Sequence, residues 1–388
     1  MRAWFLLLVT WAAAAAQQAG IFTDTYVHEI RLHMYPSDWN ALTTHYQDNT
    51  FYPADFEWQG VLVPDAAVRS RGLGSRNPTK PGLLVSFDRY VPGRRELGVT
   101  ALVLDNSYQD TSFLRERLSM LLFARAGLPA PRESYARVFV NGELMGLYVV
   151  AEDIGRAFLE RTFEGGDGRL YEYKWIFDWR FQPLSDKLDP YLQVFEPRSH
   201  LRERDRPELL ALVNAINSSP GQGYSSRVGQ VINLQQYLRY LAVEHYLGEW
   251  DGQAGTEGIN NFYLYWHGVP ARFSFIPWDK DVTLARQDFS PIRAAADFPL
   301  LNGLFQDPEI SREYGRVLAA TAALAGGSGG FMDTEARRLL AMIRTAALED
   351  PRKPASNDTF EESSESVLQY INQRVTVIFD ELDALHLR

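Results

Sequence analysis

The stretch Ala136–Val150, ARVFVNGELMGLYVV, places two apolar runs on either side of Asn141-Gly142. An Asn-Gly pair between such runs is a strong signal for a β-hairpin, because both residues tolerate the positive φ angles of a tight turn. The stretch therefore predicts two paired strands, over Arg137–Val140 and Met145–Val150.

Outward from this hairpin, the pattern of apolar residues differs between the two sides. Before it, we predict one helix after the first strand, a second helix at Ser112–Ala126, and strands at 27–34, 56–63, 67–71, 83–87 and 101–104. After Ala151, we predict a hairpin over 260–266 and 272–276, and helices at 154–162, 207–216, 234–247, 310–324, 334–347 and 360–385. The sequence thus predicts an α+β fold with a strand-rich part, 17–150, and a helix-rich part, 151–388.

Composition restricts the class of protein. The chain has 388 residues, a formal net charge of −10 and no cysteine. The negative charge argues against a nucleic-acid partner, and the lack of cysteine excludes disulfides and cysteine-ligated zinc. Residues 1–16 read as a cleavable signal peptide, with Arg2, an apolar centre and the small residues Ala14–Ala16. We therefore expect an exported protein, secreted or periplasmic, that does not span a membrane and is a monomer.

Acidic and amide residues follow or open elements of the helix-rich part. Asp251 comes after the helix at 234–247, Asn260 and Asn261 open the next strand, and Asp279 and Asp281 close the strand after that, in FSFIPWDKD. Carboxylate and amide oxygens are ligands that Mg²⁺ prefers, and phosphoryl-transfer sites use one Asp near the attacking hydroxyl with an Asn and another Asp on the metal. The alternative interpretation is two Asx-rich turns that cap helices and hairpins.

A glycine-containing loop lies in the strand-rich part. In RSRGLGSRNPTK, Gly72 and Gly74 let backbone N–H groups approach an anion, Ser75 adds a hydroxyl, and Lys80 offers a point charge to a phosphate. Alone, a Gly-x-Gly pair is more often a plain turn.

Two glutamates are further candidates for a nucleotide site together with this loop. A buried pair of Glu116 with Lys80 would position the lysine on a nucleotide, although Glu116 also suits a solvated helix face. Glu152 follows the hairpin, where it would contact a nucleotide base or ribose, or else begin the next helix.

Other chemistries have weaker support. The run Gly326–Gly330, GGSGG, lacks the preceding strand of a nucleophile elbow, and the seven histidines have no zinc-binding spacing. A glycoside hydrolase would need only two carboxylates, such as Glu249 or Asp251 with Asp279. That activity would leave the glycine loop, Lys80 and both asparagines without a role.

Several segments together resemble one family. They are VRSRGLGSRNPTKPGLLVSFDRY (68–90), LVLDNSYQDTSFLRERLSMLLFARAGLPAPRESYARVFVNGELMGLYVVAED (102–153), YLAVEHYLGEWDG (240–252), NNFYLYW (260–266) and FSFIPWDKD (273–281). In combination they resemble the CotH family, secreted proteins related to spore coat protein H with an atypical, bilobal protein-kinase-like fold. The resemblance runs from about Val68 to Asp281, and the later helices are expected to support the second lobe.

The resemblance implies transfer of the ATP γ-phosphate to a Ser, Thr or Tyr hydroxyl of a protein, assisted by Mg²⁺ or Mn²⁺. It implies that Asp251 is the catalytic aspartate and that Asp279 and Asp281, with Asn260 or Asn261, bind the metal. It implies further that Lys80 meets the nucleotide phosphates and that Glu116 orients Lys80. The main alternative is a non-catalytic relative that keeps the fold as a scaffold of the cell envelope or extracellular matrix.

Overall fold

The first part of the chain is a closed barrel. The structure is a computed structural model that describes residues 20–387, so the predicted signal peptide lies outside the described residues. The barrel strands are β1 (His28–His33), β2 (Tyr52–Trp58), β3 (Val61–Arg71), β4 (Gly82–Ser86), β5 (Ala101–Asp105), β6 (Glu133–Val140) and β7 (Glu143–Glu152). Their order is β1-β2-β3-β4-β5-β7-β6, and β1 pairs in parallel with β6 to close the ring. Closure leaves no strand edge unpaired.

The predicted hairpin is present and a second turn was missed. Asn141 and Gly142 have φ angles of 52° and 85° and join β6 to β7. The single strand predicted over 56–63 is wrong, because Gln59 and Gly60, with φ angles of 52° and 74°, turn the chain between β2 and β3. A glutamine at φ > 0 is uncommon, so this turn carries only the glycine as a signal.

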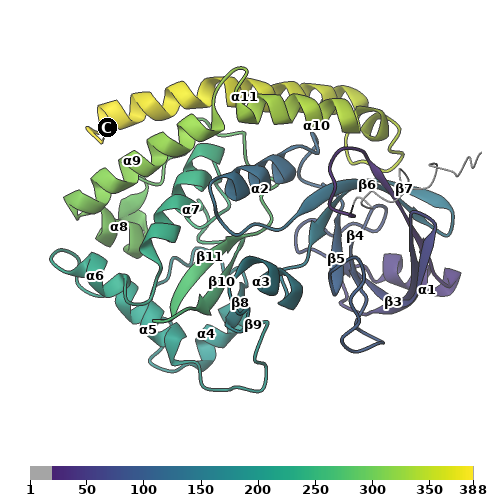
Figure 1. Cartoon of the computed structure of the whole chain (residues 1–388), viewed down its shortest axis with the longest axis horizontal. Helices are drawn as coiled ribbons and strands as arrows, with labels where there is room; N and C mark the ends of the chain where they lie inside the picture. The colour runs from purple at the N-terminus through teal and green to yellow at the C-terminus, as the bar shows by residue number, and fades with distance from the viewer. Residues whose placement is uncertain (1–19, 388) are drawn as a thin grey trace, which may run out of the picture.

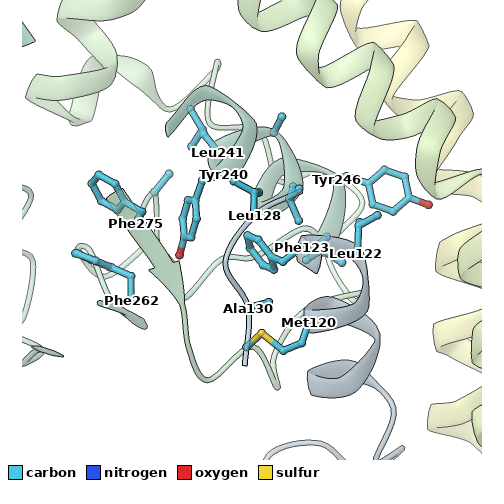
Figure 2. Packing of buried hydrophobic residues seen from close by; sticks show 14 of the residues in the cluster. Met120, Leu122, Phe123, Leu128, Ala130, Tyr240, Leu241, Tyr246, Phe262 and Phe275 are labelled. Carbon is cyan, nitrogen blue, oxygen red and sulfur yellow. The ribbon is translucent and has the colours of Figure 1, made fainter. Parts of the chain in front are cut away.

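The barrel and the second part share helix α2 (Arg115–Arg125). The helix lies within the predicted range 112–126, but its apolar side chains join the large core of the second part, not the barrel interior. Figure 2 shows Leu122 and Phe123 of α2 close to side chains of α7 (Leu234–Leu247), and the Phe123 and Tyr240 rings have centroids 5.2 Å apart. The helix therefore connects the two parts through one core.

The second part is a small sheet surrounded by helices (Figure 1). Its strands β8 (Arg169–Tyr173), β9 (Phe195–Pro197), β10 (Phe262–His267) and β11 (Arg272–Pro277) are antiparallel, in the order β11-β10-β8-β9. The remaining helices are α1 (Pro36–Thr44), α3 (Arg156–Thr162), α4 (Asp189–Val194), α5 (Pro207–Ile216), α6 (Tyr224–Val228), α8 (Pro299–Phe305), α9 (Pro308–Ala325), α10 (Phe331–Leu348) and α11 (Asn357–Ala384). Of these, α1 belongs to the barrel part. Together these elements confirm the predicted α+β class, with strands concentrated first and helices later.

The register of this sheet decides where its connections meet. Phe262 pairs with Pro277, and Tyr263 pairs with Glu172, so the start of β10 lies beside the ends of β11 and β8. The segments before β10, after β11 and after β8 therefore emerge at one end of the sheet.

The last two helices return to the barrel. In Figure 1, α10 and α11 run along one side of the molecule, and the turn between them lies near β6 and β7. Asp350 in that turn accepts hydrogen bonds from Lys80 Nζ at 2.7 Å and from the Leu147 backbone N–H at 2.9 Å. Gly146, with a φ of 125°, permits this approach, because an added Cβ would overlap the Asp350 carboxylate.

No helix in residues 20–387 combines the length and apolar character that a transmembrane helix requires.

Candidate functional site

The sheet end described above brings Asp251, Asn260 and Asn261 together. The Asn260 side-chain amide donates to Asp251 Oδ1 at 3.2 Å, and the Asn261 amide donates to Asp251 Oδ2 at 3.1 Å. Burial raises the pKa of Asp251, and the two amide donors offset part of that rise. Both amides donate through nitrogen, so their oxygens are not used in these contacts.

Two residues of the site have unusual backbone conformations. Asn261 and Asp279 have φ angles of 57° and 55°, in the left-handed region, and the Trp278 backbone N–H donates to the Asn261 carbonyl at 3.3 Å. Non-glycine residues in this region cost about 1–3 kcal/mol each and cluster at functional sites. The hydrogen bond fixes the segment that carries Asp279 beside the one that carries Asn261.

Asp279 and Asp281 form the core of an acidic cluster. Burial raises the pKa of Asp279 to about 6, with a further rise from Asp105 that Arg71 partly offsets. Burial, Asp279 and Asp105 raise the pKa of Asp281 well above its usual range. A raised pKa means that the ionised carboxylate is disfavoured in this environment, and a bound cation would favour the ionised form.

The barrel supplies acids that the sequence analysis missed. Asp105 ends β5 and Glu133 begins β6, and both raise the pKa of Glu116, whose own burial is the first cause of its rise. Asp105 follows an apolar strand as Asp279 does, so the same pattern was available as a signal. Within residues 20–387, no three His, Cys, Asp or Glu side chains form a ready-made metal-binding group. Mg²⁺ that bridges phosphates needs only one or two protein carboxylates.

Lys280, between the two aspartates, has a structural role. Its side chain is fully buried, and its Nζ lies 2.8 Å from Glu244 and 3.7 Å from Glu249. Glu249 also accepts the Asp251 backbone N–H at 2.9 Å. Burial lowers the pKa of Lys280, but the two glutamates outweigh it and the net shift is upward. Lys280 thereby anchors the loop that presents Asp251.

Lys80 and Glu116 are not paired, contrary to the sequence-based expectation. Lys80 is buried, donates to the Leu147 carbonyl at 2.8 Å and forms an ion pair of 2.7 Å with Asp350. Glu116 instead accepts the backbone N–H of Lys280. The physical reason is the return of the α10–α11 turn to the barrel, which brings a carboxylate from 270 residues away.

One cation that acts on the acidic cluster is Arg71, at the end of β3. Its guanidinium lies 4.9 Å from the centroid of the Trp278 ring, and its charge lowers the pKa of Asp279. The glycine loop follows directly: Gly72 has a φ of 111°, and its carbonyl accepts from Arg76 at 2.8 Å. Gly74 and Ser75 belong to the same loop, and the Ser75 carbonyl accepts from Asn106, next to Asp105, at 3.0 Å.

Glu152 lies in an ion-pair cluster of its own. Its side chain is completely buried and bonded to Arg132 at 2.8 Å and to Arg161 at 2.6 Å. These two arginines lower its pKa despite the burial. Glu152 therefore joins the barrel to α3. Both of its carboxylate oxygens are bonded to arginines, so neither is free for the nucleotide contact considered above.

A cavity of about 260 Å³ beside the glycine loop is lined among others by Lys80 and Asn106, but by neither Asp251 nor Asp279. Another, of about 800 Å³, opens at the opposite end of the sheet, lined among others by Arg169, Trp266 and His267. The candidate site is therefore located by its convergent polar groups and not by a deep pocket.

Comparison with known proteins gives concordant results. A family model described as "CotH kinase protein" matches residues 68–378. The inner spore coat protein H of Bacillus subtilis is 26% identical over 365 residues, 92% of this chain and 97% of the relative. The invasin CotH2 of Rhizopus delemar is 22% identical over 235 residues, 55% of this chain and 39% of the relative.

Among solved structures, the Helicobacter pylori proinflammatory kinase CtkA matches with a TM-score of 0.35 and 8% identity, over 79% of this chain and 95% of that one. The family match also corrects the extent of the resemblance, which continues through α9 and α10 into α11 instead of ending near Asp281. The chain belongs to the CotH kinase protein family.

Proposed function

We propose that the protein transfers the γ-phosphate of ATP to a hydroxyl of a protein acceptor. The observation that carries the proposal is the convergence, at one sheet end, of Asp251 with its two amide donors and the Asp279–Asp281 pair. Kinase family membership supports the same reaction class.

Asp251 is assigned to the acceptor hydroxyl. Asn260 and Asn261 hold its carboxylate in place, and its raised pKa brings it closer to that of an effective general base at neutral pH. The carboxylate accepts the hydroxyl proton while the new P–O bond forms and the bond from the γ-phosphorus to ADP breaks. The proton leaves to solvent after ADP and the phosphorylated acceptor separate.

Asp279 and Asp281 are assigned to Mg²⁺ or Mn²⁺ on the nucleotide. Their mutual repulsion and burial fit a site that holds a cation, and the unused amide oxygens of Asn260 and Asn261 are suitable further ligands. When bound, the metal would neutralise charge on the phosphates. Arg71, followed by Gly72, Gly74 and Ser75, is the phosphate-facing cation in this proposal, in place of Lys80.

The test is incubation of purified protein with γ-labelled ATP and Mn²⁺, with self-labelling and labelling of added protein as readouts. Asp251→Asn is expected to cut the rate on the order of 10²–10⁴-fold. The exposed Asp186→Asn is the matched control and should retain the wild-type rate. Equal rates for Asp251→Asn and wild type would remove the assignment of Asp251.

A non-catalytic scaffold is the second candidate, favoured by the buried Lys80–Asp350 pair, which withdraws one expected nucleotide contact. A thermal-shift titration with ATP and Mn²⁺ separates the two, because ligand that binds only the folded state raises the melting temperature. A scaffold without a nucleotide site would show no rise.

We also propose that the protein acts outside the cytoplasm. The predicted leader at residues 1–16 supports this, as does a relative named as an inner spore coat protein.

A further inference from the structure

Three consecutive apolar side chains are exposed in the connection from β8 to α4. Trp175, Ile176 and Phe177 have exposed fractions of 38%, 37% and 68%. Single exposed apolar residues are common on proteins, but a consecutive run of large ones is unusual unless it serves a contact.

The residues that follow hold this segment firmly in position. Trp179 and Phe181 are buried, and the Trp179 ring stacks on Tyr173 with centroids 6.0 Å apart. Tyr173 stacks in turn on Phe262, at 5.0 Å. The apolar side chains therefore project from a packed aromatic base, and little ordering is needed when a partner binds.

The same segment is bonded to the loop that carries Asp251. The Asp178 backbone N–H donates to the Glu257 carbonyl, and the Ile259 backbone N–H donates to the Trp179 carbonyl, both at 2.9 Å. Asn260, which bonds Asp251, follows directly. Because the end of β8 lies beside the start of β10, Trp175–Phe177 leave the sheet at the end that holds the candidate site.

Charges next to the apolar run are already paired. Lys174 lies 2.9 Å from Glu172 and 2.9 Å from Glu196, and Arg180 pairs with Asp178. Recognition by this segment would therefore depend on apolar contact. The net charge of −10 also disfavours an anionic membrane surface as the partner.

We propose that Trp175, Ile176 and Phe177 dock the protein acceptor and select an aliphatic or aromatic side chain close in sequence to the phosphorylated hydroxyl. The inference rests on the proposed phosphotransfer for its purpose, but its binding surface can be tested separately.

The experiment uses an immobilised library of serine-centred peptides in which each flanking position is varied in turn. The full-length protein is applied with γ-labelled ATP and Mn²⁺ for labelling, and without nucleotide for binding. Phe177→Ser is the variant, and Leu201→Ser, at a remote site with 73% exposure, is the matched control. Both side chains are mostly exposed, so thermal stability should match that of the wild type.

Wild type and Leu201→Ser should prefer peptides with apolar flanking residues by about fivefold or more, as expected for burying part of an aromatic side chain. Phe177→Ser should lose this preference, and it should label the peptides that lack apolar flanking residues at the wild-type rate. Absence of the preference in wild type, or its retention in Phe177→Ser, would overturn the inference and leave phosphotransfer intact.

Apolar-selective binding that depends on Phe177, without labelling of any peptide, would support the docking surface and reject the proposed reaction. If the wild-type protein shows neither labelling nor selective binding, both the docking surface and the proposed reaction are overturned. Sedimentation with phosphatidylcholine–phosphatidylglycerol vesicles completes the test, because Phe177-dependent vesicle binding would identify a membrane contact and overturn the acceptor assignment.

Discussion

Replacement of Lys80 by Met distinguishes a structural role from a nucleotide-binding role. In the structure, Lys80 and Asp350 form an ion pair of 2.7 Å, with side chains that are 3% and 0% exposed. Loss of the lysine leaves the Asp350 carboxylate buried without its cation. Removal of one partner of a buried ion pair lowers the free energy of unfolding by about 3–5 kcal/mol. At about 2 °C for each kcal/mol in a large domain, the melting temperature should fall by about 6–10 °C.

The pair can be isolated with a double-mutant cycle. Asp350→Asn keeps an acceptor for the Leu147 backbone N–H, so Lys80→Met combined with Asp350→Asn should recover part of the lost stability. We expect a coupling energy of about 1–3 kcal/mol from urea unfolding of the four proteins. Lys353→Met is the matched control, because the Lys353 amine only approaches the Asp350 carbonyl at 3.4 Å.

Nucleotide affinity is the second readout of the same variants. Calorimetry should show that Lys80→Met changes the affinity for Mn²⁺–ATP by less than about threefold, which is under about 1 kcal/mol. A variant with unchanged stability and abolished ATP binding would refute the structural role and return Lys80 to the phosphates.

Three further predictions concern other parts of the fold. Gly146→Ala should lower the free energy of unfolding, measured in urea, by more than about 1 kcal/mol. The new Cβ would displace the Asp350 carboxylate, and alanine would be strained at the φ of 125° that residue 146 adopts. Lys280→Met should lower the free energy of unfolding by about 3–5 kcal/mol and abolish transfer, because two buried glutamates lose their cation. Burial lowers the pKa of His245. Burial alone would raise the pKa of Glu381, but the hydrogen bond with His245 outweighs it and the net shift is downward. Since both folded-state values lie below the unfolded ones, both contributions to stability are full above about pH 6.5 and are lost as the pH falls. Urea unfolding of His245→Gln should therefore depend less on pH between about 6.5 and 4, and an unchanged slope would contradict the assignment.

Local signals predicted much of the fold. The Asn141-Gly142 turn and the helices α5 and α7 were predicted with the bounds that the structure shows or close to them, because turn chemistry and apolar periodicity act within a few residues. The convergence of Asp251 with Asn260 was also predicted, since antiparallel neighbours place their connections at one sheet end.

Partners from distant segments were not predicted. Lys80 was assigned to a phosphate and a nucleotide contact was considered for Glu152, whereas tertiary contacts supply Asp350 for Lys80 and supply Arg132 and Arg161 for Glu152. A lone lysine or glutamate carries no sequence signal for the partner that folding will bring.

Calorimetric titration of ATP in the presence and absence of Mn²⁺ tests whether Asp279 and Asp281 bind the metal–nucleotide complex. We predict that wild-type protein and the Asp186→Asn control bind ATP with Mn²⁺ and bind it much more weakly without the metal. Asp279→Asn should lose the metal-dependent binding while its thermal stability is retained or increased, because it removes a repelled charge. Equal Mn²⁺–ATP affinity in Asp279→Asn and wild type would contradict the account.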